Sequence, residues 1–293
     1  TDATKIDCLV CHDTTGAYKK HPTADGGGGP PALMINGELT VVGSAQLQNV
    51  AYNVGKPTRA NCGACHFYAG GDDNVKHGDL SSHLINPTRA MDVHMGGRNF
   101  ACQTCHQASQ HGIAGQAIHH VAEGGASPDC TRCHGAENVH RAERLETPVY
   151  AAVLNQHSNR VHCTVCHIPA FSRSMPTKME WYWSEAGQDI SPIPTDQYGK
   201  QLYDKKKGRF VFAQNVRPTY LWYDGQWTRK VVGINDTYTE AGTPEDPIVL
   251  AAPAATFATP GAKLYPFKAM RGDQPIDPLN KRLLVPHLFG GAA

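Results

Sequence analysis

The hydrophobic residues of this chain occur in short runs separated by turn-rich segments, which predicts short elements rather than long helices. Short helices are expected at residues 46–54 and 149–159. Aromatic strands are expected at 210–212 and 220–223, and Asp224-Gly225 predicts a hairpin turn from the second strand into 227–232. The glycine- and proline-rich stretch 26–31 is expected to be irregular.

Composition strengthens the expectation of a loop-rich fold. Hydrophobic residues make up 40% of the chain, and glycine (29) and proline (20) are frequent among the 293 residues. The most apolar stretch, 248–262, is broken by Pro253 and Pro260, so no membrane-spanning segment is expected. A net charge of +1 does not favour binding to nucleic acid or to anionic lipid.

One pentapeptide pattern, Cys-x-x-Cys-His, occurs five times and uses all ten cysteines. The five copies are Cys8-Leu-Val-Cys11-His12, Cys62-Gly-Ala-Cys65-His66, Cys102-Gln-Thr-Cys105-His106, Cys130-Thr-Arg-Cys133-His134 and Cys163-Thr-Val-Cys166-His167. The pattern is the attachment motif of c-type haem, in which both thiols bond to the porphyrin and the histidine is the proximal iron ligand. A zinc site or a disulfide scaffold needs no histidine directly after the second cysteine, and these are the weaker alternatives. We therefore expect five covalently bound haem c groups.

Eleven histidines lie outside the motifs, and five of them could complete bis-histidine coordination. We expect the distal ligands among those that lie close to a motif in polar or glycine-flanked loops, namely His77, His94, His111, His140 and His157, with His21, His83 and His119 in reserve. For His120, His162 and His287 a surface or hydrogen-bonding role is the stronger expectation. The spacing does not say which distal histidine serves which haem.

The motifs divide the chain unevenly. Residues 1–170 are expected to form the pentahaem-binding region, with each motif on a helix of one or two turns. Residues 171–293 contain no cysteine but all four tryptophans, and are expected to form an aromatic- and proline-rich cap on the haem region. The overall fold class is therefore a loop-rich multihaem cytochrome c with a small β-hairpin region in its C-terminal part. Because haem is attached to such motifs outside the cytoplasm, we expect an exported protein, periplasmic or extracellular.

Several longer segments resemble the octahaem tetrathionate reductase family of multihaem cytochromes c. These segments are residues 7–20, 54–67, 75–80, 92–95, 163–169, 176–179, 183–187 and 265–275. The resemblance implies a multihaem cytochrome fold, and members of the family carry an active-site haem whose motif ends in lysine. This chain has no Cys-x-x-Cys-Lys motif, so it resembles a five-haem member without the reactive haem.

Two functions follow from these features. The first is electron transfer along five bis-histidine haems, with other redox proteins or an extracellular acceptor as partners. In a sharper form, copies of the chain stack end to end as a conductive extracellular filament, in which His21 of one copy ligates a haem of the next. The alternative is a periplasmic reductase of a small sulfur or nitrogen oxo-compound such as tetrathionate, nitrite or hydroxylamine, which would need one iron with an open sixth position.

Overall fold

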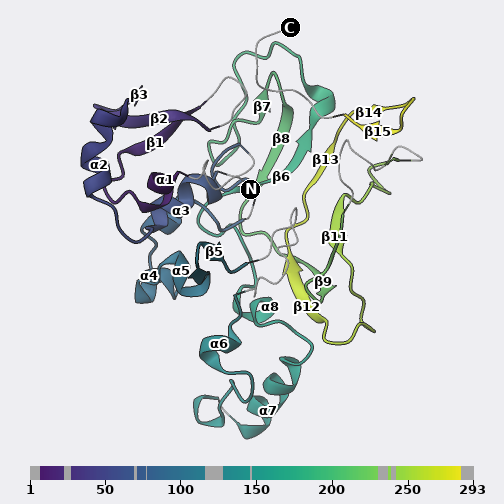
Figure 1. Cartoon of the computed structure of the whole chain (residues 1–293). Coiled ribbons are helices and arrows are strands. Elements are labelled where there is room, and N and C mark those ends of the chain that lie inside the picture. The colour runs from purple at the N-terminus through teal and green to yellow at the C-terminus, as the bar shows by residue number, and fades with distance from the viewer. Residues whose placement is uncertain are drawn as a thin grey trace.

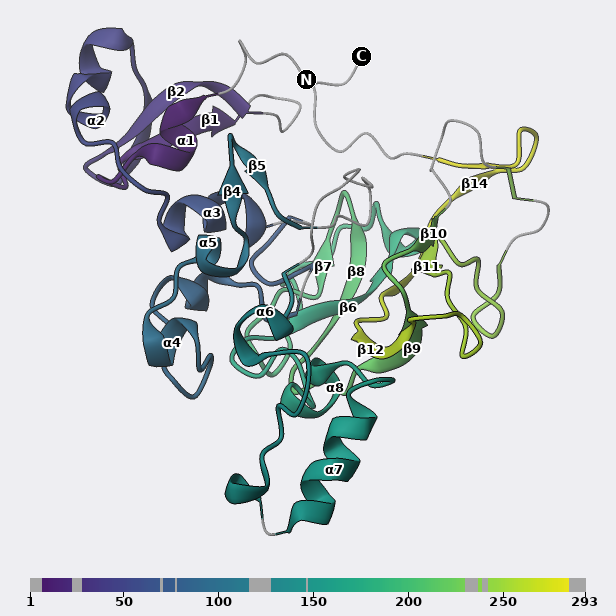
Figure 2. The same cartoon turned by 60° about the horizontal axis from the view of Figure 1, so that its bottom comes forward.

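A computed structural model describes residues 7–22, 28–68, 71–76, 78–115, 128–145, 147–229, 237–238 and 242–284 (Figure 1). Helices occupy the first half of this part of the chain, and strands dominate the second half. Each Cys-x-x-Cys-His motif overlaps one short helix, and the five helices are α1 (Cys8–His12), α3 (Arg59–His66), α5 (Cys102–Cys105), α6 (Thr131–His134) and α8 (Cys163–His167). Cys130 is the N-cap of α6, and His106 is the C-cap of α5. Each helix spans one or two turns, as expected from the sequence. In both views these helices follow one another from α1 through α3 and α5 to α6 and α8 (Figures 1 and 2).

The remaining helices lie between the motifs, except for one short turn that follows the fifth motif. They are the α-helices α2 (Gln48–Tyr52), α4 (Met95–Arg98) and α7 (Pro148–His157), and the 3₁₀ turns η2 (Ser44–Leu47), η3 (Ser82–Ile85), η4 (Ala142–Arg144) and η5 (Trp183–Glu185). Helices α2 and α7 fall inside the expected ranges 46–54 and 149–159 to within one residue. Thr147 caps α7 by accepting a hydrogen bond from the backbone N–H of Tyr150, and Pro148 occupies the first helical position, where its missing N–H has no cost.

A three-stranded antiparallel sheet packs beside the first motif. It contains β1 (Tyr18–Pro22), β2 (Gly28–Ile35) and β3 (Glu38–Val41), with β2 in the centre. The expectation of irregular structure at 26–31 is therefore wrong for residues 28–31. Pro31 lies where the β2–β3 ladder ends, next to the last paired residues Ala32 and Val41. Its carbonyl accepts a hydrogen bond from the N–H of Val42, and only the reciprocal bond at this end is missing because proline has no N–H.

The second half is built from small sheets. Strands β13 (Arg271–Asp273), β6 (Thr177–Tyr182), β8 (Gly208–Ala213) and β7 (Tyr203–Asp204) form a four-stranded sheet in that order. Two-stranded antiparallel pairs form between β9 (Thr219–Tyr223) and β12 (Lys263–Phe267), β10 (Trp227–Arg229) and β11 (Ala251–Pro253), β14 (Ile276–Asp277) and β15 (Arg282–Leu283), and, near the third motif, β4 (Ala108–Ser109) and β5 (Gly112–Ile113).

The hairpin expected around Asp224-Gly225 is not formed in the described residues. A turn is present, with Gly225 at a φ of 96°, but β9 and β10 pair with different strands that come later in the chain. Local turn residues predicted the change of direction correctly. The pairing partner was decided instead by the aromatic contacts of β9 with β12, in which the rings of Tyr223 and Tyr265 lie 5.4 Å apart.

The strand-rich half contacts the motif-bearing half directly. Leu264 of β12 exchanges backbone hydrogen bonds with Arg160 and His162, immediately before the fifth motif. Thr177 of β6 donates its hydroxyl hydrogen to the carbonyl of Asn74. These contacts hold the second half against both the 71–76 loop and the fifth motif.

Side chains alone fill little of the interior. The chain exposes 19672 Å² of surface, whereas a compact monomer of this length exposes about 12,000 Å². The hydrophobic cluster of Val75, Phe210 and Phe212 is small, and large side chains such as Tyr52 (79% exposed) and Val149 (71% exposed) lie open near the motifs. The polypeptide therefore has the shape of a scaffold with room for large apolar groups. Among the described helices, none is long and apolar enough to cross a membrane.

Candidate haem sites and their histidine pairs

The first motif begins at a capped helix end. A carboxylate oxygen of Asp7 accepts the backbone N–H of Leu9 at 3.1 Å and starts α1. Lys20 and Tyr18 of β1 bind the same carboxylate, with a Lys20 Nζ–oxygen distance of 2.7 Å. Burial alone would raise the pKa of Asp7, but the hydrogen bonds from Lys20 and Tyr18 outweigh it and lower that pKa. The carboxylate therefore stays ionised and ties α1 to the N-terminal sheet.

The second motif is fixed to its neighbours by one asparagine and one arginine. Asn61 completes a capping box with Thr58 at the start of α3 and donates its amide hydrogens to the carbonyls of Val10 and Asp13, at the end of the first motif. Arg59 reaches the other way. Its guanidinium donates to the carbonyls of Ile85, Met95 and Phe100 and to the side-chain oxygen of Asn99. Because Phe100 comes just before the third motif, Arg59 connects the second motif to the third.

Further contacts continue this succession. The side-chain amide of Gln103 in α5 donates to the carbonyl of Pro57, which precedes the second motif. Arg132 of α6 donates to the side-chain oxygen of Gln107, which follows the third motif. The first four motifs are thus linked in chain order by polar side chains whose role could not be predicted from the sequence.

The thiols of successive motifs also come close to one another. The interacting pairs are Cys11 with Cys65, Cys62 with Cys102, Cys105 with Cys133, and Cys130 with Cys163. Contact with Cys102, together with burial, raises the pKa of Cys62, because two neighbouring thiols do not readily ionise together. All ten cysteines are free thiols. None is joined in a disulfide, so all ten are available for thioether bonds.

Three motif histidines each face a second histidine. The ring centroids of His12 and His111 lie 6.2 Å apart, and those of His134 and His94 lie 6.0 Å apart. His167 faces His140 with a centroid distance of 6.3 Å and nearly parallel rings. All three outer histidines are candidate ligands predicted from the sequence, whose spacing does not indicate their partners. The fold supplies the partners, in each case across 27 or more residues of chain.

Local structure positions these outer histidines. His111 lies with Gln110 at the tip of the β4–β5 hairpin, where both residues have positive φ angles (65° and 49°), as a tight two-residue hairpin turn requires. His94 follows Asp92, whose carboxylate accepts the backbone N–H groups of His94 and Met95. His140 is held by hydrogen bonds to the side chain of Asn155 in α7.

Hydrogen bonds determine which ring nitrogen is free in several of these histidines. Nδ1 of His12 lies 2.7 Å from the carbonyl oxygen of Gly55, and Nδ1 of His106 lies 3.0 Å from that of Ala114. A carbonyl only accepts, so both Nδ1 atoms carry the hydrogen and both Nε2 atoms keep a lone pair. Asn155 acts in the same way on His140. Its side-chain oxygen accepts from the backbone N–H of His140 at 2.9 Å and lies 3.2 Å from Nδ1. A free Nε2 is the arrangement that a metal-binding imidazole needs.

The other predicted histidines are placed differently. His157 ends α7 with an exposed side chain and contacts no motif histidine in the described residues. His21 lies in β1, and His83 in η3 near α3. His77, His119, His120 and His287 lie outside the described residues.

His162 differs from the candidate ligands in its hydrogen bonds. Its Nδ1 accepts the backbone N–H of Thr164 and so caps α8, and its ring lies 4.4 Å from that of Tyr265. Burial lowers the pKa of His162, although the nearby Asp129 opposes this shift. These contacts agree with the hydrogen-bonding role expected for this histidine.

Comparison with known proteins identifies the fold. A family model described as "Cytochrome c bacterial" matches residues 178–293. An uncharacterized protein of Archaeoglobus fulgidus is 28% identical over 119 residues, which cover 36% of this chain and 37% of the relative. The crystal structure of an octaheme cytochrome c from Shewanella oneidensis matches 99% of this chain with a TM-score of 0.78 and 38% sequence identity. This chain has the fold of a multihaem cytochrome c.

The chain corresponds to only part of each similar protein. The cytochrome spans 58% of the length of the octaheme cytochrome c, and about one third of the Archaeoglobus relative. The family model covers the strand-rich half and none of the five cysteine motifs. The motif-bearing half is therefore related to known proteins through the solved structure.

The residues of the cytochrome fit covalently bound haem. An iron between two imidazoles, with metal–nitrogen bonds of about 2 Å, places the two ring centroids about 6 Å apart. The three observed histidine pairs have this separation. The free thiols stand three residues apart on short helices beside each motif histidine, and the large exposed surface leaves room for the macrocycles. Within the described part of the chain, no three histidine, cysteine or acidic side chains cluster as a zinc site would require.

Proposed function

We propose that the cytochrome transfers electrons one at a time along five haem c groups, each attached to one Cys-x-x-Cys-His motif. The observation that carries this proposal is the set of three histidine pairs with centroid separations of 6.0 to 6.3 Å. A histidine on each side of an iron fills both axial positions and leaves no site for a substrate. The arrangement therefore suits electron transfer better than reduction of a small molecule.

Each residue set has a defined task in this proposal. The ten cysteines anchor the macrocycles, and His12, His66, His106, His134 and His167 are the proximal ligands. His111, His94 and His140 are the distal ligands for the first, fourth and fifth motifs. His77 and His157 are the sequence-based candidates for the other two, with His21 and His83 in reserve. When bound, haem c supplies an iron that accepts and releases one electron. The backbone carbonyls of Gly55 and Ala114 and the side chain of Asn155 keep the ligand rings oriented.

The electron path follows the order of the motifs. The four interacting thiol pairs join motif one to two, two to three, three to four, and four to five. Because the thiols bond to the edge of the macrocycle, neighbouring thiols bring the edges of neighbouring haems together. The result is a row with two ends, one at α1 and the other at α8. The likeness to the octaheme cytochrome c supports a row of several haems.

Haem counting tests this function. A pyridine haemochrome assay on the purified holoprotein should return five haems per polypeptide, because all ten cysteines belong to motifs. Clearly fewer than five would contradict the proposal. An electron paramagnetic resonance spectrum should show only low-spin iron. One high-spin haem would instead favour the reductase alternative, which needs an open axial position.

We also propose that the protein acts outside the cytoplasm, as haem c attachment requires, and that its copies stack end to end as a conductive filament. A row of haems with two ends can be extended by a neighbouring copy, and repeated contacts that do not close form filaments. A net charge of +1 leaves little repulsion between copies. His21 is the candidate ligand from one copy to the next. Electron microscopy of native material should show filaments, and discrete particles at all concentrations would exclude them.

A further inference from the structure

Two lysines, Lys178 buried and Lys268 half-buried, lie where the strand-rich half meets the 71–76 loop. Lys178 of β6 is only 4% exposed, and its Nζ stands 3.5 Å from the ring centroid of Phe210 and 4.7 Å from that of Trp181. Among the described residues no oxygen accepts a hydrogen bond from this ammonium group. Lys268, directly after β12, donates to the carbonyl of Val75 and to the hydroxyl of Thr177, both at 2.6 Å. An ammonium group has three hydrogens, so one N–H of Lys268 is left for another acceptor.

The charges around these lysines do not balance. Asp72 and Asp204 are the carboxylates that act on Lys178, but Asp72 is paired with Lys200 at 3.0 Å and Asp204 with Lys207 at 3.9 Å. Four ammonium groups, those of Lys178, Lys200, Lys207 and Lys268, therefore share two carboxylates within the described residues. Buried charge without a counter-ion is strongly disfavoured. Burial, with the nearby charge of Lys178, lowers the pKa of Lys268 to about 7, and burial lowers the pKa of Lys178 to about 8.

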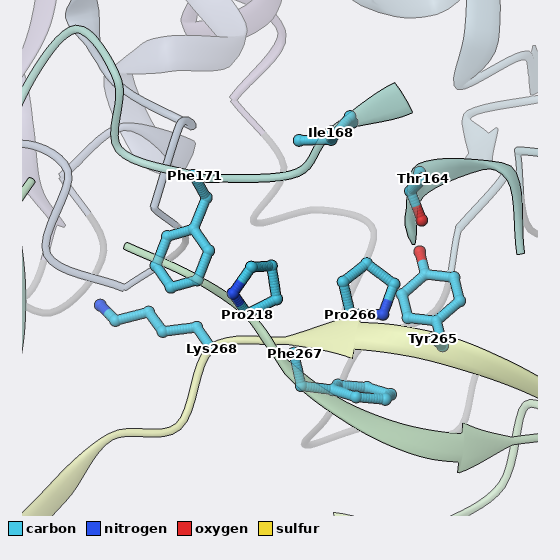
Figure 3. Close-up of a pocket in the computed structure, with 8 residues that line it drawn as sticks. All are labelled: Thr164, Ile168, Phe171, Pro218, Tyr265, Pro266, Phe267 and Lys268. Atoms are coloured by element: carbon cyan, nitrogen blue, oxygen red, sulfur yellow. The ribbon is translucent and has the colours of Figure 1, made fainter. Parts of the chain in front are cut away.

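An apolar cavity opens beside Lys268. Its volume is about 200 Å³, and its walls are mainly aromatic and aliphatic (Figure 3). The lining residues are Thr164, Ile168, Phe171, Pro218, Tyr265, Pro266, Phe267 and Lys268. Figure 3 shows the Lys268 amine below Phe171, at the end of the cavity farthest from Tyr265. Thr164 and Ile168 belong to the fifth motif and the residue after it, so the cavity borders a haem-attachment helix. Apolar walls with the amine of Lys268 at one end suit the binding of a flat, apolar group that ends in a carboxylate.

We propose that Lys268, backed by Lys178, binds the propionate of one of the haems carried by this cytochrome. The inference rests on the proposed function to the extent that it needs at least one bound haem. A propionate supplies the missing negative charge and accepts a hydrogen bond from the third N–H of Lys268. The apolar walls of the cavity contact part of the macrocycle. A small carboxylate from solution has the same chemistry. The propionate is favoured because the cavity borders the fifth attachment helix and the carboxylate then arrives with the covalently bound cofactor.

The test replaces Lys268 in the full holoprotein. Lys268→Met removes the charge and the donor, Lys268→Arg keeps both, and Lys205→Met removes a charge from an exposed lysine on the same half of the molecule. Spectroelectrochemical titration gives the haem midpoint potentials, and the propionate-bending bands of the resonance Raman spectrum report hydrogen bonding to a propionate. Lys268→Gln, which keeps a donor, serves if the methionine variant does not fold.

The expected result is a lower midpoint potential for one haem in Lys268→Met, since loss of a nearby positive charge favours the ferric state. A shifted propionate band should accompany it, and Lys268→Arg and Lys205→Met should retain both wild-type properties. Unchanged potentials and bands in Lys268→Met would overturn the proposal. A second outcome would also overturn it. If benzoate raises the melting temperature of the wild type but not that of Lys268→Met, Lys268 binds a carboxylate from solution and not a haem propionate. A haem content below five per polypeptide would contradict the proposed five-haem function but not the propionate contact of Lys268.

Discussion

At the scale of single residues, the defining feature is a motif histidine with Nδ1 engaged and Nε2 free. His12 and His106 reach this state through backbone carbonyls, and the candidate distal ligand His140 reaches it through Asn155. Each bond fixes the tautomer and the direction of the ring before a metal arrives. The His12–His111 and His140–His167 pairs therefore each contain one ring that the polypeptide itself orients.

The pairing of His111 with His12 makes a direct prediction for spin state. His111→Ala should open one axial position, so that one haem becomes high-spin while the others stay low-spin. His111→Met should keep that haem low-spin and raise its potential, because a thioether favours the ferrous state. Electron paramagnetic resonance and redox titration measure both. His162→Asn is the matched control, since asparagine also caps a helix. A low-spin His111→Ala protein would refute the pairing.

Asn155 provides a second test at this scale. Asn155→Ala removes its hydrogen bonds with the backbone and the ring of His140, and should reduce the free energy of unfolding by about 1–2 kcal/mol. The potential of one haem should change as well, because the ligand ring loses its orientation. Thermal unfolding and redox titration measure the two effects. Asn159→Ala, an exposed position just beyond the same helix, should change neither.

At the scale of elements, very short helices are stable here because they are tied to one another. Isolated helices of four to eight residues are unstable in water, since nucleation costs more than the few hydrogen bonds return. Capping by Asp7, Thr58 and His162 satisfies orphan backbone groups. The side chains of Asn61, Arg59 and Arg132 join the first four motifs in chain order. The linkage fixes the spacing of these motifs, and with it the spacing of the proposed haem row.

Arg59 tests this linkage. Arg59→Ala removes the hydrogen bonds from α3 to the carbonyls of Ile85, Met95 and Phe100, and should lower the free energy of unfolding by about 2–3 kcal/mol. Because the third motif follows Phe100, electron exchange between the second and third haems should also slow. Denaturant unfolding and flash-induced electron transfer measure these quantities. Arg98→Ala, which removes an exposed arginine from α4, should have little effect.

At the scale of the whole molecule, the polypeptide lacks the buried area of an ordinary protein of its length. It exposes 19672 Å² where about 12,000 Å² is usual, and large apolar side chains remain open around the motifs. Hydrophobic burial is the main favourable contribution to folding, so the bound macrocycles must supply the missing part. A small core forms where Val75 of the 71–76 loop packs against Phe210 and Phe212 of the strand-rich half.

The chain without haem is therefore expected not to fold. Replacement of all ten cysteines by alanine should give a protein whose circular dichroism shows no cooperative thermal transition, because the apolar cradle then faces water. The holoprotein, produced with haem attached, should unfold cooperatively in the same measurement. A cooperative, native-like melt of the cysteine-free chain would contradict this account of its stability.

The sequence by itself determined the chemistry of the molecule: thiol pairs with an adjoining histidine are local patterns, so attachment of haem c and the short motif helices could be predicted from neighbouring residues. It also marked His94, His111 and His140 as candidate ligands. Only the tertiary structure decided which motif each of them faces, because such contacts join residues far apart in the chain and depend on how loops fold back. The tertiary structure also decided that β9 pairs with β12 and that arginine and asparagine side chains link the motifs. It alone brings Lys178 near Lys268, because these residues meet only when β6 and the end of β12 pack against the 71–76 loop.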